Sequence, residues 1–226
     1  MSYIIKKIFA WSVIPLVQWY LTKDRNFRYQ QLKVKVFRGV FHPGFYFSTK
    51  LLLKHLGGLS LARQKFLELG AGTGIISLLA ARQGAQVTAS DINPDAIANI
   101  CHNKQTHKAK IEVIQSDLFD SFADRTFDYI VINPPYYPKN PQSNSEQAWY
   151  CGENFEYFTK LFGQLPDFLK SNGQAIMILS SDCAIDHIRQ MAQNHGLQWQ
   201  QIKKVRVWWE HNYLFKITCQ PSQSAS

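Results

Sequence analysis

The chain lacks paired cysteines and metal-binding spacings. Its four cysteines stand far apart, and the 226 residues contain neither a CxxC pair nor a histidine at ligand spacing from a cysteine. A zinc site and a disulfide framework are therefore not expected, and isolated thiols fit a reducing compartment. We predict a cytoplasmic protein without a bound metal ion.

Acidic residues are scarce relative to basic ones. The 16 Asp and Glu face 25 Lys and Arg, which gives a formal net charge of +9 and a pI of about 9.4. A basic surface favours polyanions such as RNA, DNA or an anionic membrane. However, the Lys and Arg are scattered rather than joined in one run, so a merely basic enzyme is the simpler interpretation.

A hydrophobic run long enough to span a bilayer is also missing. Residues 4–21 are rich in apolar side chains, but the uncharged stretch Ile8–Val17 is too short to span, and no small-residue cleavage site follows. The preferred interpretation is a helix that docks on the rest of the chain. The alternative is peripheral membrane contact through an interfacial helix.

The length suits one domain with a short extension. We predict an N-terminal helical and strand extension over residues 1–60, a main domain over 61–220 and a polar tail over 221–226. Hydrophobic periodicity and turn residues predict the elements. The expected strands are 32–37, 65–69, 86–90, 111–115, 127–132, 175–179, 198–207 and 213–219, and the expected helices are 48–56, 75–83, 94–105, 153–169 and 186–194.

Strands that alternate with helices imply an α/β fold with a mostly parallel sheet and helices on both faces. The two closing strands, joined by a Glu-His-Asn segment, are expected to pair antiparallel. Ser48 or Thr49 is a plausible N-cap, and Pro166 is expected to bend or split its helix.

A glycine-rich turn follows the strand at 65–69 and opens the next helix. It reads Glu68-Leu69-Gly70-Ala71-Gly72-Thr73-Gly74, with a glycine at every second position. Such a turn lets the backbone bend sharply and approach a ligand closely. The dinucleotide pattern fails at Ile75, and a phosphate-binding Walker loop is excluded because no Lys-Ser or Lys-Thr follows.

Further acids end the next two strands. Asp91 lies where such folds place a ribose-binding carboxylate, with Ile92 beside it as an adenine contact, and Asp117 is placed to meet the adenine amino group. Since the carboxyl ends of parallel strands meet in one crevice, we expect these side chains to converge.

These features resemble the class I S-adenosylmethionine-dependent methyltransferases, from about Val36 to Thr218. The resemblance implies a Rossmann-like seven-stranded sheet with one antiparallel C-terminal strand, and S-adenosylmethionine as cofactor. The residues that it assigns to the cofactor are Thr49, Glu68, Gly70, Gly72, Gly74, Asp91, Ile92, Asp117, Leu118 and Asn133.

The strand at 127–132 ends in Asn133-Pro134-Pro135-Tyr136. Two prolines stop the strand and stiffen the loop. The Asn133 side-chain oxygen and the Pro134 carbonyl are two acceptors that can grip both hydrogens of one NH2 group. Tyr136 offers a flat face to a planar substrate. We predict that these four residues are catalytic and that the acceptor is a planar amide or exocyclic amino nitrogen.

The motif is similar to that of the HemK/PrmC-type glutamine methyltransferases and of small RNA adenine-N6 methyltransferases. Two other segments, Ala148–Gly152 and His42–Thr49, resemble the former group, although Cys151 replaces a common glycine. A protein glutamine side chain is therefore the first hypothesis for the acceptor, and adenine N6 of tRNA or rRNA is the alternative.

A second alternative is an inactive protein that binds the cofactor and serves a partner. The expected partners are a protein substrate or structured RNA, and we expect a monomer.

Overall fold

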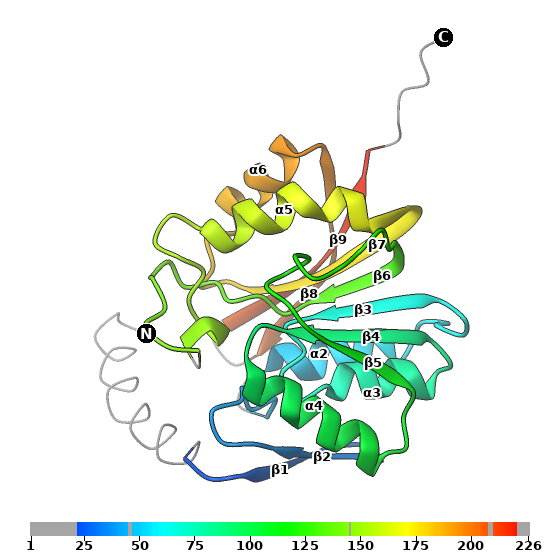
Figure 1. Ribbon diagram of the computed structural model, residues 1–226. Coiled ribbons are helices and arrows are strands. Elements are labelled where there is room, and N and C mark those ends of the chain that lie inside the picture. The colour runs from blue at the N-terminus through cyan, green and yellow to red at the C-terminus, as the bar shows by residue number, and fades with distance from the viewer. Residues whose placement is uncertain (1–21, 45–46, 145, 208–209, 221–226) are drawn as a thin grey trace.

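The computed structural model describes residues 22–44, 47–144, 146–207 and 210–220 (Figure 1). The apolar segment 4–21, the tail 221–226 and residues 208–209 lie outside the described residues. Seven strands form the main sheet, in the order β5-β4-β3-β6-β7-β9-β8. Their bounds are β3 Lys65–Leu69, β4 Gln86–Asp91, β5 Ile111–Gln115, β6 Phe127–Ile132, β7 Leu169–Ser180, β8 Leu197–Val207 and β9 Glu210–Cys219.

The predicted sheet topology is confirmed. The strands β3 to β7 pair parallel with one another, and β9 pairs antiparallel with both β7 and β8. The strand order reverses between β3 and β6, since β4 and β5 lie on one side of β3 and β6 lies on the other. In an open α/β sheet, ligands bind beyond the carboxyl ends of the strands at such a switch point.

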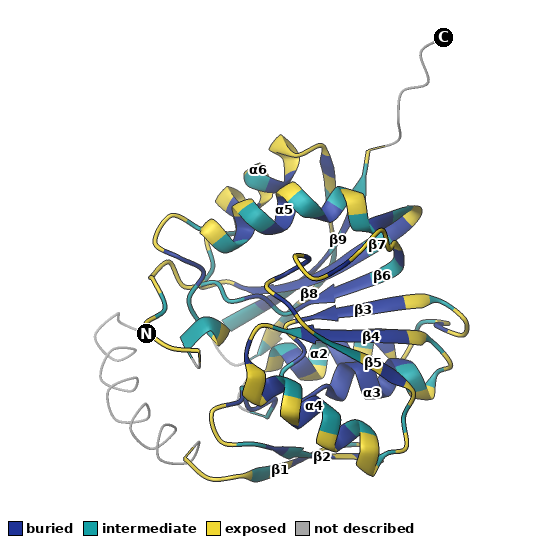
Figure 2. Cartoon of the chain, viewed as in Figure 1, coloured by how far each residue is buried: buried dark blue, intermediate teal, exposed yellow. Residues whose placement is uncertain are grey.

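Helices cover both faces of the sheet (Figure 1). One face carries α2 (Phe47–Leu56), α3 (Ile75–Arg82) and α4 (Pro94–Thr106), and the other carries α5 (Glu156–Phe168) and α6 (Ile185–Asn194). Successive strand residues face opposite sides. In β3, Phe66 therefore joins the core under α2 and α3, while Leu67 and Leu69 join the core under α5. Figure 2 shows the resulting buried sheet between partly exposed helices.

The N-terminal extension contributes a two-stranded antiparallel hairpin, β1 (Arg25–Tyr29) and β2 (Leu32–Val36). The sequence predicted β2 but not β1. The segment Arg-Asn-Phe-Arg-Tyr contains no aliphatic residue, and no strong turn signal precedes it. Phe27, Val34 and Val36 are buried in the same core cluster as α2 and α3. Tertiary packing therefore stabilises a strand that local sequence does not specify.

Other boundaries differ from the prediction for local reasons. The helix α2 begins at Phe47, so Ser48 and Thr49 lie inside it and neither is its N-cap. The helix α5 is continuous through Pro166. The strand β7 begins six residues early because Gly173 allows an irregular register beside β6. Glu210–Asn212 belongs to β9 rather than to a turn.

None of the helices in the described ranges combines the length and apolarity needed to cross a bilayer.

Candidate cofactor and acceptor site

A cavity of about 480 Å³ lies at the carboxyl ends of β3, β4 and β6, within the usual size of small-molecule sites. Its wall includes every predicted site residue except Gly74. These residues are Thr49, Glu68, Gly70, Gly72, Asp91, Ile92, Asp117, Leu118, Asn133, Pro134, Pro135 and Tyr136. Segments far apart in the sequence are thus brought to one edge of the sheet.

The glycine turn has left-handed backbone at Gly70, Gly72 and Gly74, with φ of 67°, 53° and 72°. A Cβ at Gly70 would meet no atom within 4 Å, so the space beside it is open on the cavity side. Gly74 differs, because a Cβ there would lie 3.1 Å from the Ile100 side chain. Gly74 therefore serves the close packing of α3 against α4 and is not among the residues that line the cavity, so its contact with the cofactor stays a prediction.

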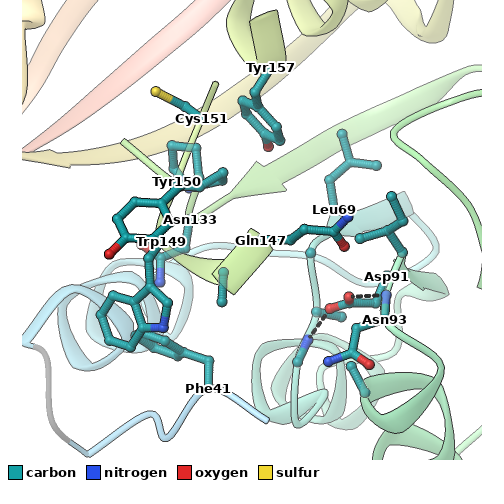
Figure 3. A pocket seen from close by; sticks show the side chains of 18 of the residues that line it. Phe41, Leu69, Asp91, Asn93, Asn133, Gln147, Trp149, Tyr150, Cys151 and Tyr157 are labelled. Atoms are coloured by element: carbon teal, nitrogen blue, oxygen red, sulfur yellow. Dashed lines mark hydrogen bonds between the residues drawn. The ribbon is translucent and has the colours of Figure 1, made fainter. Parts of the chain in front are cut away.

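Asp91 is fixed by two backbone groups. Its Oδ2 accepts a hydrogen bond from the Gly72 amide at 2.9 Å, and its Oδ1 accepts one from the Asn93 amide at 2.9 Å (Figure 3). Burial raises the pKa of Asp91, although these bonds oppose the shift. A carboxylate offers about four lone-pair sites, so two remain for the hydroxyls of a ligand. Ile92 beside it is 36% exposed and presents an apolar face to the cavity.

Glu68 is buried, and its carboxyl group faces the first turn of α3. Oε2 accepts hydrogen bonds from the Ser77 amide at 2.8 Å and from the Ser77 hydroxyl at 2.5 Å. Burial raises the pKa of Glu68 to about 8, against these bonds and with a contribution from the nearby Asp91 charge. Glu68 therefore holds β3 to α3 as well as lining the cavity.

Asp117 reaches the cavity wall as part of an ion pair. Its Oδ2 lies 2.6 Å from Nζ of Lys160 on α5, and the same ammonium contacts Oδ2 of Asp120 at 2.6 Å. The sequence did not predict this cation. It leaves the second Asp117 oxygen as the candidate acceptor for an adenine amino group. The next residue, Leu118, is buried in left-handed backbone with φ of 50°.

The residues present fit S-adenosylmethionine. The open side of Gly70 gives room for close approach to backbone, Asp91 supplies hydroxyl acceptors, and Ile92 supplies an apolar face. These groups match an amino acid, a ribose and an adenine in chemistry, and they follow one another along the cavity wall.

The Asn-Pro-Pro-Tyr loop leaves β6 and is held by the segment 149–152. The amides of Tyr136 and Tyr137 both donate to the Trp149 carbonyl oxygen, at 3.2 and 3.0 Å, and the Cys151 amide donates to the Tyr137 carbonyl at 3.0 Å. Pro134 is buried. These bonds give the segment Ala148–Gly152, which the sequence singled out by resemblance alone, a physical role as the clamp on the loop.

Several cavity residues were not assigned to the site from the sequence, among them Phe41, Gln147, Trp149 and Tyr157. Phe41 and Trp149 pack with ring centroids 5.2 Å apart and form an aromatic part of the cavity wall, while Gln147, from the short helix Glu146–Ala148, and Tyr157, from α5, also line the cavity (Figure 3). Phe41, Gln147 and Tyr157 lie outside the recognised motifs, and Trp149 lies in the segment Ala148–Gly152, which was noted by resemblance but not assigned to the site. Only the aromatic density around Trp149 and Tyr150 could have drawn attention to them.

Gln147 and Tyr157 supply polar groups to the cavity. Oε1 of Gln147 is buried without a hydrogen-bond partner in the described part of the chain, so a ligand donor would satisfy it. Burial, with smaller contributions from the Asp117 and Asp91 charges, raises the pKa of Tyr157. Tyr157 therefore remains a neutral phenol that can donate a hydrogen bond.

Comparison with known proteins places this site among methyltransferases. The sequence profile of the methyltransferase small domain matches residues 31–206. A protein of Methanocaldococcus jannaschii named as a protein N5-glutamine methyltransferase is 31% identical over 156 residues, which cover 66% of this chain and 77% of the relative. The tRNA1(Val) (adenine(37)-N6)-methyltransferase of Shewanella loihica is 32% identical over 148 residues, 61% of each chain.

A solved structure has the same fold. The T. thermophilus 16S rRNA N2 G1207 methyltransferase, in complex with AdoMet and guanosine, superposes with a TM-score of 0.65 at 18% identity. The match covers 88% of this chain and 50% of that enzyme, so this chain corresponds to about half of its length.

Proposed function

The chain belongs to the methyltransferase small domain family, and from that premise we propose that it transfers a methyl group to the side-chain nitrogen of a protein glutamine. S-adenosylmethionine is the cofactor of this class of enzyme and supplies an electrophilic methyl group when bound. The observation that carries the proposal is that Asn133–Tyr136 lies on the same cavity wall as Gly70, Gly72 and Asp91.

The acceptor nitrogen needs orientation more than a base. The lone pair of an amide is delocalised, so the nitrogen is a poor nucleophile. The Asn133 side-chain oxygen and the Pro134 carbonyl oxygen would accept the two NH2 hydrogens and hold the nitrogen in place. The hydrogen bonds that the Tyr136 and Tyr137 amides donate to the Trp149 carbonyl oxygen keep this loop in position before the methyl acceptor arrives. The product nitrogen loses its proton to water.

The relative from M. jannaschii supports glutamine as the acceptor, since it is named for N5-glutamine methylation and is matched over 77% of its length. The intact Asn133-Pro134-Pro135-Tyr136 sequence argues against an inactive protein that only binds the cofactor.

Methyl transfer into a fractionated cell extract tests the acceptor. The chain is incubated with S-adenosylmethionine carrying a labelled methyl group, and label is measured in protein, RNA and lipid. Label in protein that mass spectrometry maps to a glutamine supports the proposal, whereas label confined to RNA rejects it.

Substituting Asn133, whose side-chain oxygen is proposed to hold the NH2 group of the substrate, tests the mechanism. Asn133→Ala should lower the transfer rate about 10²- to 10³-fold, as loss of a preorganised hydrogen-bonding group does in other active sites, while cofactor affinity stays within a few-fold. Asn172→Ala, at an exposed position in the β7 irregularity, is the matched control and should leave both unchanged.

The aromatic wall favours adenine N6 of RNA as the second candidate. Phe41, Tyr136, Trp149 and Tyr150 all line the cavity, and Nζ of Lys139 lies 4.6 Å from the Tyr150 ring centroid. Such faces stack nucleobases. The Shewanella loihica relative is named for this reaction. Activity in the extract that disappears after nuclease treatment would favour this acceptor.

We further propose a monomer in the cytoplasm, with residues 1–60 as an extension on a 61–220 catalytic domain and residues 4–21 docked on the protein. Light scattering tests the monomer. Flotation with anionic vesicles tests the alternative of peripheral membrane contact, which protein found in the vesicle fraction would support.

A further inference from the structure

The net positive charge is confined to the N-terminal extension. Residues 1–60 contain ten Lys and Arg and one acidic residue, Asp24, whereas residues 61–226 contain fifteen of each kind. The formal charge of +9 therefore belongs entirely to the extension, and the catalytic domain is neutral. An even scatter of basic residues, which the sequence first suggested, does not describe this distribution.

The hairpin concentrates part of this charge on one rigid face. Its inner side chains, Phe27, Val34 and Val36, are buried. The outer face is made of two cross-strand pairs, Asn26 with Lys35 and Arg28 with Lys33. It carries no apolar side chain.

Arg28 lies directly opposite Lys33, an arrangement that costs stability. Both side chains belong to exposed residues, and neither forms an ion pair in the described part of the chain, while Lys35 pairs with Asp24 at 2.9 Å. Folding alone gives no reason for two like charges at this position. A polyanion bound to the outer face would attract both side chains and so offset their mutual repulsion.

Two buried asparagines of α4 anchor the hairpin. Asn103 accepts from the Lys35 amide at 2.9 Å and donates to the Lys35 carbonyl at 2.8 Å, and Asn99 accepts from the Phe37 amide at 2.9 Å. Asn103 also donates to the carbonyl of Thr73 in the glycine turn at 3.0 Å. The charged face is therefore held in fixed relation to the cofactor turn.

The chain that leaves β2 leads directly into the cavity wall. Gly39, Val40 and Phe41 follow Phe37 and Arg38 and line the cavity. A molecule held on the outer face of the hairpin is thus connected to the acceptor site by a short stretch of backbone.

We propose that the outer face of the β1–β2 hairpin, with Arg28 and Lys33 at its centre, is a docking surface for the phosphate backbone of RNA. The charge is complementary to phosphate, and a face without apolar side chains suits a polyanion better than a protein core contact or lipid insertion. This surface lies outside the methyl-transfer site, and the inference does not rest on which nitrogen receives the methyl group.

Binding of a fluorescein-labelled RNA hairpin with a single-stranded loop, followed by anisotropy at several salt concentrations, tests the proposal on the full chain. Arg28→Glu with Lys33→Glu should weaken binding by at least about tenfold and reduce the slope of log K against log salt by about 2, since two phosphate contacts are lost. Cofactor affinity, measured on the same proteins, should not change.

The matched control carries Arg189→Glu with Lys204→Glu. Both residues are exposed, they lie on α6 and β8 at the other end of the sheet, and the change in net charge is identical. This control should bind the RNA within a few-fold of the original chain. Arg28→Gln with Lys33→Gln replaces the reversal variant if the latter loses cofactor binding, and it should still weaken RNA binding several-fold.

Three results would overturn the proposal. They are an original chain that does not bind the RNA, a control variant that loses as much affinity as the hairpin variant, and a preference for phosphatidylserine vesicles over RNA. Failure of methyl transfer to any glutamine, with RNA binding intact, would instead reject the proposed acceptor alone.

Discussion

The proposed extension, residues 1–60, and the proposed catalytic domain, residues 61–220, use charge in opposite ways. In the domain, cations are matched by anions, and Lys160 and Lys170 each contact carboxylates between 2.6 and 2.8 Å. In the extension, ten cations share one acidic residue. The neutral region contains the glycine turn and the Asn-Pro-Pro-Tyr loop, and the charged region contributes the hairpin and part of the cavity wall. The residues proposed for methyl transfer and the residues proposed to attract a polyanion therefore lie in different parts of one fold.

The link between the regions depends most on Asn103. Asn103→Ala should destabilise the protein by roughly 3 kcal/mol, because it leaves the half-buried Lys35 amide and the buried Thr73 carbonyl without their partners. Urea unfolding measures the loss, with Asn172→Ala as the control. An effect below about 1 kcal/mol would mean that the hairpin and the domain are only weakly coupled.

The carboxylate of Asp91 should affect cofactor binding by the catalytic domain but not RNA binding by the hairpin. Asp91→Asn should weaken S-adenosylmethionine binding by about 10- to 100-fold, since hydrogen bonds to a charged group contribute about 1.5–3 kcal/mol. Calorimetry measures the affinity. RNA binding should stay unchanged, so a parallel loss of both would argue against the division between the two regions.

Glu68 should make stability depend on pH. Its folded pKa of about 8 lies above the 4.5 of an ordinary glutamate, so the folded state keeps a proton that the unfolded chain releases. The contribution of Glu68 to stability should be fully present below about pH 4.5, fall as pH rises toward 8 and then level off.

Glu68→Gln should remove on the order of 1–2 kcal/mol from the difference in unfolding free energy between pH 5 and pH 6.5. Urea unfolding at both pH values provides the test. Parallel curves for the variant and the original chain would show that Glu68 is ionised throughout.

The smallest effect is expected on the outer face of the hairpin. Lys33→Glu should stabilise the protein by about 0.5 kcal/mol, because an opposite-charge pair with Arg28 replaces a like-charge pair. Thermal unfolding at low salt measures the change, and Lys204→Glu is the control. A variant that is more stable but binds RNA more weakly would show that the like-charge pair serves binding at a cost in stability. A destabilised variant would contradict the like-charge argument.

The described core elements were largely predictable, because their signals are local. The strands 65–69, 111–115 and 127–132 have the predicted bounds, since each is a short apolar run between turn residues. The glycine turn and Asn133–Tyr136 were recognisable because their spacing is contiguous. By contrast, β1, Gln147 and Tyr157 were missed because their surroundings come from residues distant in the sequence.

The sequence by itself determined the order of strands and helices, the two motifs and the total charge, since each depends on neighbouring residues or on composition. The tertiary structure decided that Gly74 packs on Ile100 instead of lining the cavity, that Lys160 reaches Asp117, and that Trp149 clamps the loop after β6. It also decided which basic side chains share a rigid face. These are contacts between segments far apart along the chain, and only packing brings such segments together.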